Sequence, residues 1–497
     1  MARMPSYFVA CDLGAESGRV ILGNLQNGFL TIEEIHRFSN VVIVLDGTMR
    51  WDVLRLFHEL KKGLSLLGQR GVALTSLSVD SWGVDYAWSG LGQSLLSAAH
   101  CYRDPRTEPA YTHALATVGP EKIFAETGLQ FMPLNTLYQL LTDAADEPRL
   151  VDAADRFLCI ADFLNFLFCG IPRAEESLAS TTQLYNPITR SWSSELIATF
   201  NLPERIFPQI VQSGTALGSV RTEILEETGL APTQVVATCS HDTGAAIAAV
   251  PAEAGEDWAY LSSGTWSLIG VELPSPLINA ATREANFTNE GGFDGTTRFL
   301  KNITGLWILQ ECRRDWERRG HAYDYAELNR LAAESHPFRT LINPNDPRFL
   351  RAGDMQEKLA AFARETSQPI PATPGEFTRA VLESLALLYR EALATIEELT
   401  SRKIRVLHIV GGGSQSVLLN QFAADATGRD VIAGPVEATA IGNTLIQAIV
   451  AGEVASLAEL RACVRKSFPV LTYHPTGESA WTEVFSRFES LRGSNRE

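Results

Sequence analysis

The sequence predicts an α/β protein of two domains, and three observations lead to this prediction. The chain has 497 residues, which is too long for a single hydrophobic core. Near its midpoint, residues 234–239 are β-branched and apolar enough for a buried strand, and the small residues 244–250 follow as a helix. A strand, a turn of small residues and a second strand open the chain at residues 7–24, and this order recurs about 250 residues later, at 258–270. We therefore expect two similar halves, each with one turn that can hold phosphate.

The composition excludes several classes of partner. Apolar residues make up 45% of the chain and charged residues 20%, as in an ordinary globular protein. With 42 basic and 58 acidic side chains the net charge is −16, so neither a nucleic acid nor an anionic membrane is an expected partner. No apolar run approaches the roughly 20 residues of a membrane span, and no signal-peptide core follows Met1, which predicts a cytoplasmic protein. The seven cysteines contain no CxxC pair, so we expect buried free thiols and no zinc site.

The first two strands, at residues 7–12 and 20–24, flank a tight turn. The turn can present several N–H groups and the Ser17 hydroxyl to an anion, and Asp12 at the strand end can hold a cation beside it. An ordinary β-turn with an incidental aspartate explains the pattern equally well.

A third strand at residues 30–38, an amphipathic helix at 51–68 and a fourth strand at 74–80 come next. The fourth strand ends in a loop where Trp82 either fills the core or stacks on a sugar ring that the backbone at Gly83 approaches closely. Short helices broken by Pro and Gly follow, from residue 102 to about 229, and predict an insertion that shapes a pocket.

His241 and Asp242 lie at the carboxyl end of the central strand. In open α/β sheets this edge faces the ligand crevice, so both residues are acid/base candidates. Asp242 can instead serve only as the N-cap of the next helix, and the local sequence alone favours that role.

The second half contains two more candidate ligand turns. One, at residues 262–267, joins two strands and is rich in hydroxyls. The other has three glycines, Gly411 to Gly413, between a strand at 406–410 and a helix at 417–427, where free N–H groups favour an anion or a nucleoside edge. Neither GxGxxG nor GxxxxGK[ST] occurs, so dinucleotide binding is weakly supported and no Walker lysine is expected. The remaining expected elements are a strand at 298–303, a helix at 304–319 and the longest helix at 374–400.

Four motifs, in their order and spacing, resemble the FGGY carbohydrate kinases of the actin-like ATPase superfamily: residues 12–19, 240–243, 262–267 and 411–414. Further strings resemble the rhamnulokinase branch of that family: residues 80–85, 102–106, 130–139, 300–303, 341–346 and 431–437. The likeness runs from about residue 8 to residue 470. It implies two RNase H-like domains that flank a catalytic cleft, with residues 1–247 binding mainly the sugar and residues 248–497 mainly ATP.

The resemblance also implies a reaction and a set of site residues. ATP, with Mg²⁺, would phosphorylate the 1-hydroxyl of L-rhamnulose in L-rhamnose catabolism. Asp242 would be the general base, and Asp12 would help to position the metal. The implied sugar contacts are Gly83, His241, Asp242, Thr243 and Asn302, and the implied nucleotide contacts are Ala15, Glu16, Ser17, Gly18, Arg19, Thr265, Gln310 and Gly412.

Two departures from the wider family bear on the substrate. Ala15 occupies a position where most FGGY kinases have Thr, and residues 131–139 lack the Lys and Trp of the usual first signature. Both agree with the rhamnulokinase branch and disfavour glycerol, xylulose and gluconate. L-Fuculose remains the nearest rival, because it differs from L-rhamnulose only in hydroxyl configuration.

Two other functional classes share parts of this pattern. An actin-like or chaperone-like ATPase would have the nucleotide turns but no need for His241 and Asp242. An inactive sugar-responsive regulator would keep the fold and lose the base, and Asp242 is present. Whether the protein is a monomer or a dimer is left open.

Overall fold

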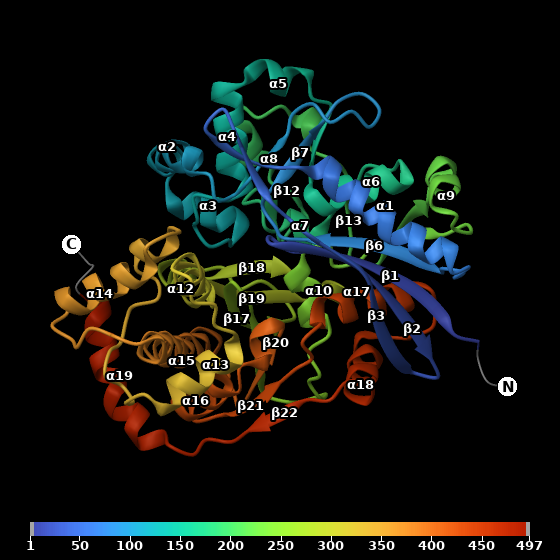
Figure 1. The fold of residues 1–497 in the computed structure, drawn as a ribbon. Helices are drawn as coiled ribbons and strands as arrows, with labels where there is room; N and C mark the ends of the chain where they lie inside the picture. The colour runs from blue at the N-terminus through green and yellow to red at the C-terminus, as the bar shows by residue number, and fades with distance from the viewer. Residues whose placement is uncertain (1–3, 494–497) are drawn as a thin grey trace. The chain divides into compact units, whose positions relative to one another are not determined.

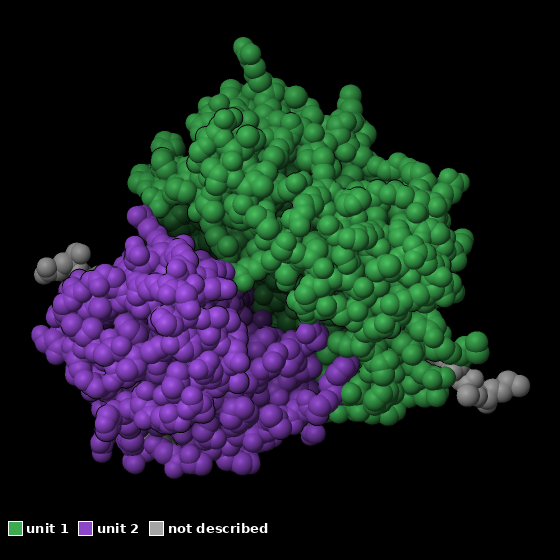
Figure 2. Space-filling model, viewed as in Figure 1, with its two compact units in different colours: residues 1–249, 272–299, 438–467 green, residues 250–271, 300–437, 468–497 purple. Residues whose placement is uncertain are grey.

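The computed structural model describes residues 4–493 (Figure 1). It divides into two compact units, which are coloured separately in Figure 2. Unit 1 comprises residues 1–249, 272–299 and 438–467, and unit 2 comprises residues 250–271, 300–437 and 468–497. Strands and helices of both units follow one another along the chain, which confirms the α/β class. No helix among the described residues is long and apolar enough to span a membrane.

Unit 1 contains a six-stranded sheet with the order β14-β15-β6-β1-β2-β3. Strands β1, β2 and β3 form an antiparallel meander, whereas β1, β6 and β15 are parallel to one another. The three parallel strands therefore end at the same edge, and the register pairs Asp12 of β1 with Asp80 of β6 there. The bounds are β1 Ser6–Leu13, β2 Ser17–Gln26, β3 Phe29–Ser39, β6 Ser76–Ser81, β14 Thr215–Ser219 and β15 Gln234–Ala237.

Helices from both ends of unit 1 pack on this sheet. Helix α1 (Val53–Gln69) buries a stripe of leucines, including Leu56, Leu60 and Leu64. Helix α10 (Asp242–Ala248) follows β15 and packs against α17 (Ala438–Val450), which in turn covers β1 and β6. Figure 1 shows α17 and α18 (Leu457–Ser467), in orange and red, beside the blue strands β1 to β3.

Polar contacts tie α17 to the strands that it covers. The Gln447 Nε2 atom donates to the Val9 carbonyl at 2.9 Å, and its Oε1 atom accepts from the Ser76 hydroxyl at 2.6 Å. The Asn443 side-chain Nδ2 atom donates to Asp80 Oδ2 at 2.6 Å. Since all these groups are buried, a segment more than 360 residues away in the sequence satisfies polar groups of β1 and β6.

The insertion between β6 and β14 contains the expected short helices, and also several short strands. Its own apolar core surrounds the buried Asp143, whose carboxylate accepts from Tyr86, Trp88 and Arg106 at 2.5, 2.8 and 2.6 Å. The other elements of unit 1 are β4 Val42–Leu45, β5 Thr48–Trp51, β7 Tyr86–Ser89, β8 Ala99–His100, η1 Pro105–Thr107, α2 Glu108–Val118, α3 Pro120–Thr127, α4 Thr136–Asp146, α5 Pro148–Ala153, β9 Arg156–Cys159, α6 Ile160–Cys169, β10 Ala174–Glu175, α7 Glu176–Ala179, β11 Tyr185–Asn186, β12 Ser191–Trp192, α8 Ser194–Thr199, η2 Glu204–Ile206, β13 Ile210–Val211, α9 Thr222–Thr228, α11 Ala280–Glu284, β18 Thr288–Gly291 and η3 Phe293–Gly295.

The second sheet has the order β18-β19-β17-β16-β20-β21-β22. Here β16 pairs antiparallel with β17 and parallel with β20, which is parallel to β21, so a hairpin again lies beside two parallel strands. The recurrence that the sequence predicted is thus present in the topology. The elements are β16 Trp258–Ser263, β17 Trp266–Leu273, β19 Thr297–Thr304, α12 Trp307–Arg318, α13 Tyr325–Glu334, η4 Pro347–Leu350, α14 Met355–Glu365, α15 Pro374–Thr400, β20 Val406–Val410, η5 Gly412–Gln415, α16 Val417–Thr427, β21 Asp430–Ala433, β22 Leu471–Tyr473 and α19 Glu478–Gly493.

The compact units are not continuous segments. The chain passes from unit 1 to unit 2 after Ala249, close to the predicted limit at residue 247, but residues 272–299 and 438–467 belong to unit 1. The compact units therefore do not test the division into residues 1–247 and 248–497, which stays a prediction. All seven cysteines are free thiols, six of them buried and Cys169 partly so.

Candidate active site

The strand end at β15 fixes the backbone of the candidate catalytic pair. The Ser240 amide donates to the Glu175 carboxylate at 3.0 Å, and the His241 amide donates to the Ser177 hydroxyl at 3.0 Å. Helix α10 begins at Asp242, and its N-cap is His241. The possibility that Asp242 serves only as an N-cap is therefore wrong, because its side chain lies one position beyond the cap.

The Asp242 carboxylate has one occupied and one available oxygen. Its Oδ1 atom accepts from the Thr243 amide at 2.6 Å and the Thr243 hydroxyl at 3.2 Å, and lies 3.4 Å from His241 Nε2. Within residues 4–493, no hydrogen bond to Oδ2 is found, and 29% of the side chain is exposed. Burial raises the pKa of Asp242, an effect that His241 opposes and Asp12 reinforces. A raised pKa and a free oxygen suit a proton acceptor.

Three carboxylates gather at this sheet edge. Asp12 forms an ion pair with Arg19, and Asp80 lies opposite Asp12 in the register. Burial, and then the charge of Asp12, raise the pKa of Asp80 well above its ordinary value, and Asp242 adds to this effect. Asp80 Oδ1 is buried without a hydrogen bond, while Oδ2 is held by Asn443.

This edge fits a magnesium ion that is held partly by phosphate. Among residues 4–493 no group of three His, Cys, Asp or Glu side chains could hold a metal. Mg²⁺ needs no such group, because it usually keeps several waters and binds one or two carboxylates together with substrate phosphates. The Asp12 carboxylate and the unbonded Oδ1 of Asp80 provide oxygen ligands of this kind.

The first turn is built by contacts that the sequence did not reveal. The Gly14 amide donates to the Ser17 carbonyl at 2.9 Å, and Asn40 bonds to both the Glu16 and Gly14 carbonyls at 2.9 and 3.0 Å. The carbonyl groups of the turn thus point back into the protein. Ala15, Glu16 and Ser17 remain partly or fully exposed, as a nucleotide contact requires.

The second turn of unit 1, after β6, is strained. Val84 has φ = 67°, a left-handed conformation that β-branched residues rarely adopt. It is held by a hydrogen bond from its amide to Thr181 at 3.1 Å and by one from the Thr136 hydroxyl to its carbonyl at 2.6 Å. A Cβ atom on Gly83 would lie 2.9 Å from the Thr181 hydroxyl, so glycine is needed there. Strain of this kind is typical of functional sites.

Trp82 belongs to the core rather than to an open pocket. Its side chain is 6% exposed, its ring centroid lies 4.5 Å from that of Trp51, and its Nε1 atom donates to Asp85 at 2.9 Å. The suggestion that Trp82 stacks on a sugar is therefore wrong, because both of its partners lie inside the protein.

Unit 2 brings together the other three predicted nucleotide residues. The carbonyls of Gly264 and Thr265 accept from Leu306 and Trp307 at 3.0 and 3.2 Å, so α12 begins against the turn that carries Thr265. A Cβ on Gly411 would lie 3.1 Å from the Ser263 carbonyl, so the glycine turn lies beside the same strand end. On α12, the Gln310 Oε1 atom is buried without a hydrogen bond, as expected for an atom that a ligand completes.

The structure divides the predicted site residues between the units. Gly83, His241, Asp242 and Thr243 lie in unit 1, together with Asp12 and residues 15–19. Asn302, on β19, lies in unit 2 with Thr265, Gln310 and Gly412. The predicted sugar contacts are thus not all in one unit.

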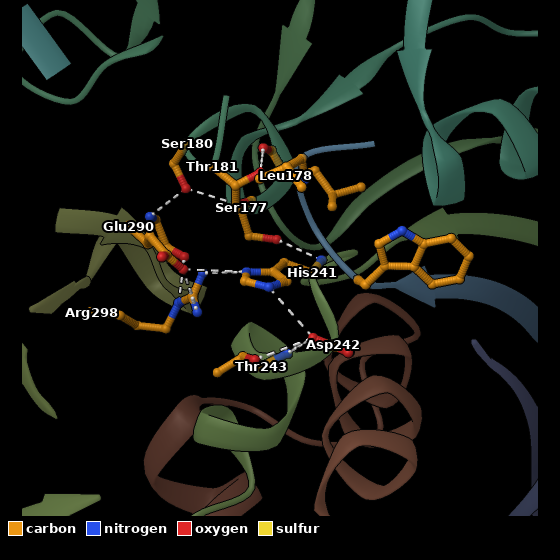
Figure 3. A network of polar contacts seen from close by, with 12 residues as sticks. Ser177, Leu178, Ser180, Thr181, His241, Asp242, Thr243, Glu290 and Arg298 are labelled. Carbon is orange, nitrogen blue, oxygen red and sulfur yellow. Dashed lines mark hydrogen bonds and ion pairs between the residues drawn. The ribbon is translucent and has the colours of Figure 1, made fainter. Parts of the chain in front are cut away.

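Two buried charged residues next to His241 were not predicted from the sequence. Glu290 of β18 and Arg298 of β19 lie within 3.3 Å of His241 Nδ1 (Figure 3). The available signal was a charged residue, Arg298, directly before the apolar pair Phe299 and Leu300 at the start of a strand. Neither residue belongs to a motif, and both are far from residue 241 in the sequence.

Comparison with known proteins identifies the family. Residues 7–249 match the N-terminal domain of the FGGY family of carbohydrate kinases, and residues 259–451 match its C-terminal domain. The chain belongs to this family. This FGGY kinase is 42% identical to the rhamnulokinase of Bacteroides thetaiotaomicron over 98% of its own length and 99% of that protein. It is 43% identical to the rhamnulokinase of Enterococcus faecalis over 94% of each chain.

Solved structures agree on the fold. Gluconate kinase from Lactobacillus acidophilus superposes with a TM-score of 0.82 at 15% identity, covering 99% of this FGGY kinase and 98% of that chain. Xylulose kinase from the same organism gives 0.82 at 16% identity, covering 98% of each. These likenesses confirm the predicted two-domain fold. The family match and the curated relatives show that this FGGY kinase is a phosphotransferase that acts on a carbohydrate.

Proposed function

We propose that this FGGY kinase uses ATP to phosphorylate the 1-hydroxyl of L-rhamnulose, giving L-rhamnulose 1-phosphate and ADP in the breakdown of L-rhamnose. The observation that carries the chemistry is the Asp242 carboxylate, with Oδ1 engaged and Oδ2 available at the strand end. The sugar is supported by rhamnulokinases that match almost the whole chain at 42% and 43% identity.

The proposed chemistry is a proton transfer coupled to phosphoryl transfer. Asp242 Oδ2 accepts the proton of the 1-hydroxyl as that oxygen forms a bond to the γ-phosphorus of ATP, and the bond to the β-phosphate oxygen of ADP breaks. The raised pKa of Asp242 makes it a better base than an exposed carboxylate. Gly83, His241, Thr243 and Asn302 position the sugar, which supplies most of the rate in such loose transfers.

The nucleotide and its metal are assigned to the remaining residues. The turn from Ala15 to Arg19 holds phosphate, while Thr265, Gln310 and Gly412 hold ATP in unit 2. Asp12, with Asp80 beside it, would hold Mg²⁺, which would supply positive charge against the phosphates. Because ATP and a free ketose are the substrates, we place the enzyme in the cytoplasm, with no nucleic-acid or membrane partner.

The test is an ADP-release assay with ATP and Mg²⁺ in which L-rhamnulose, L-fuculose, D-xylulose, L-ribulose and glycerol are compared. L-Rhamnulose should give the highest kcat/KM. Asp242→Asn keeps the shape but removes the base, and should lower kcat by about 10²–10⁴-fold. Asp46→Asn, at an exposed aspartate, is the matched control and should leave kcat unchanged.

Other outcomes discriminate between the alternatives. A preference for L-fuculose with an inactive Asp242→Asn variant would retain the mechanism and refute the proposed sugar. ADP release that needs no sugar and survives Asp242→Asn would refute the kinase proposal and favour an ATPase.

A further inference from the structure

We propose that Arg298 and Glu290 are positioning residues that hold His241 in one tautomer, with its proton on Nε2, and so direct a neutral N–H group at Asp242. The inference concerns the same site as the proposed function, and its kinetic test rests on that function. Its spectroscopic test does not.

The three side chains form a buried chain within unit 1 (Figure 3). Arg298 is 0% exposed, Glu290 4% and His241 7%. The Arg298 Nη2 atom lies 3.1 Å from His241 Nδ1, and the Nη1 atom lies 3.1 Å from Glu290 Oε2. The Arg298 Nε atom donates to the Gly291 carbonyl at 2.9 Å, which fixes the plane of the guanidinium group.

The contact with Arg298 determines the tautomer. A guanidinium group has five N–H donors, no acceptor, and does not lose its proton in proteins. The hydrogen bond at 3.1 Å therefore requires a lone pair on His241 Nδ1. A neutral imidazole that accepts at Nδ1 carries its proton on Nε2. Nε2 is the atom that lies 3.4 Å from Asp242 Oδ1.

Glu290 makes the role of Arg298 necessary. Its Oε2 atom lies 3.3 Å from the same His241 Nδ1. Burial alone would raise the pKa of Glu290, but the charge of Arg298 opposes this effect and the pKa lies below its ordinary value, so Glu290 is an anion. Without Arg298, this anion would draw a proton onto Nδ1. The imidazole would then point a lone pair at Asp242 or become a cation.

The consequence for the reaction concerns the basicity of Asp242. A neutral N–H donor orients the Asp242 carboxylate. A charged imidazolium would instead form an ion pair with this carboxylate and lower the basicity of Asp242. The charged groups that face His241 are Asp242 on its own helix, Glu290 from β18 and Arg298 from β19. The charge of Asp12, on β1, raises the pKa of both Asp242 and Asp80, and Asp80 lies on β6. Arg298 is thus the donor that occupies the lone pair on His241 Nδ1.

The first experiment reads the tautomer directly. The full-length protein is labelled with ¹⁵N-histidine, and the His241 ring is assigned by comparison with a His241→Gln variant. Two-bond proton–nitrogen spectra without substrate should show Nε2 protonated and Nδ1 unprotonated at pH 7. A proton on Nδ1, or on both nitrogens, would overturn the inference. Since no turnover is needed, this result is valid even if the proposed sugar is wrong.

The second experiment uses matched variants. Arg298→Met removes the donor, should move the His241 proton to Nδ1, and should lower kcat by about 10–100-fold, as loss of a group that orients a functional imidazole does. It should also add a second ionisation to the pH profile of kcat/KM near neutral pH, from the new imidazolium. Arg298→Lys keeps an N–H donor and should restore most of the rate and the single ionisation.

Arg190→Met is the control for loss of a nearby Arg–Glu pair. Arg190 binds Glu176 at 2.9 and 2.5 Å and does not contact His241. The Arg190→Met variant should have a lower thermal stability and an unchanged pH profile of kcat/KM. A wild-type pH profile in Arg298→Met, or no rescue by Lys, would refute the proposal. If Arg298→Met does not fold, Arg298→Lys and the spectra of the wild-type protein decide the question.

Discussion

At the scale of single residues, hydrogen-bond occupancy distinguishes two carboxylates whose pKa burial raises, Asp85 and Asp242. Asp85 accepts hydrogen bonds from Trp51, Trp82, Tyr102 and Gln139, which together occupy both of its oxygens. Asp242 has donors on one oxygen only. Asp85 therefore supports the turn that carries Gly83, whereas Asp242 can take part in chemistry.

Asp85 should make stability depend on pH. Burial raises the pKa of Asp85 to about 6, although its four hydrogen bonds each lower the pKa. Its folded-state pKa thus lies above its unfolded value of roughly 3.9, so the folded state binds more protons between these values and stability is lost as pH rises through about 6. From pH 4.5 to 7.5 the wild-type protein should lose about 2 kcal/mol relative to Asp85→Asn.

Urea unfolding of both proteins at the two pH values measures this loss. The difference between wild-type and variant cancels the other titrating groups. Asp46→Asn should show no change in the difference with pH, because Asp46 is exposed. An equal difference at both pH values for Asp85→Asn would contradict the assignment.

At the scale of elements, the long helices were predictable, whereas the strained conformation of the turn after β6 was not. Periodicity and the capping residue Thr373 located helix α15 to the residue, at 374–400, and the helix expected at 417–427 is α16. The strained turn at Val84 could not be foreseen, because the left-handed conformation is imposed by Thr136 and Thr181 on other elements. Local sequence preference would have excluded it.

The same limit applies to the site. Asp242, His241 and the glycine turns carry local patterns, and the resemblance added their roles. Glu290 and Arg298 became visible only when β18 and β19 brought them to His241. A contact between distant strands has no local signal in a single sequence.

Gly412 and Gly413 of η5 allow a test of the predicted nucleotide contact at Gly412. A Cβ on Gly412 meets no atom within 4 Å, whereas a Cβ on Gly413 would lie 2.0 Å from the Ser263 hydroxyl. Gly412→Ala should leave the free energy of unfolding within about 0.5 kcal/mol of wild type. If Gly412 lines the nucleotide, the added methyl should raise KM for ATP by at least about 10-fold.

Steady-state kinetics with varied ATP, together with urea unfolding, checks both statements. Gly413→Ala is the contrasting variant and should lose stability, because Ser263 must move. An unchanged KM for ATP in Gly412→Ala would place the nucleotide elsewhere.

At the scale of the whole molecule, unit 1 depends on residues from the far end of the chain. From helix α17, Asn443 and Gln447 bond to buried polar groups of β6 and β1. The predicted division at residue 247 did not foresee this, because helix amphipathicity shows that a face is buried but not which sheet buries it.

Gln447→Leu should destabilise the protein by about 2–5 kcal/mol, because it leaves Val9, Ser76 and Asn443 with unsatisfied buried groups. Urea unfolding followed by fluorescence measures the loss. Gln69→Leu, on an exposed position of α1, should change stability by less than about 0.5 kcal/mol. Equal stability of the two variants would show that α17 does not complete unit 1.

The return of the chain to unit 1 also bears on protein synthesis. Translation at about 5–20 residues per second separates the emergence of residue 249 from that of α17 by roughly ten seconds or more. During this interval β1 and β6 have already been synthesised, but the helix that covers them has not. A chaperone that binds exposed apolar strands would find its target then, and a transcript cut before codon 438 would yield a product that quality control removes.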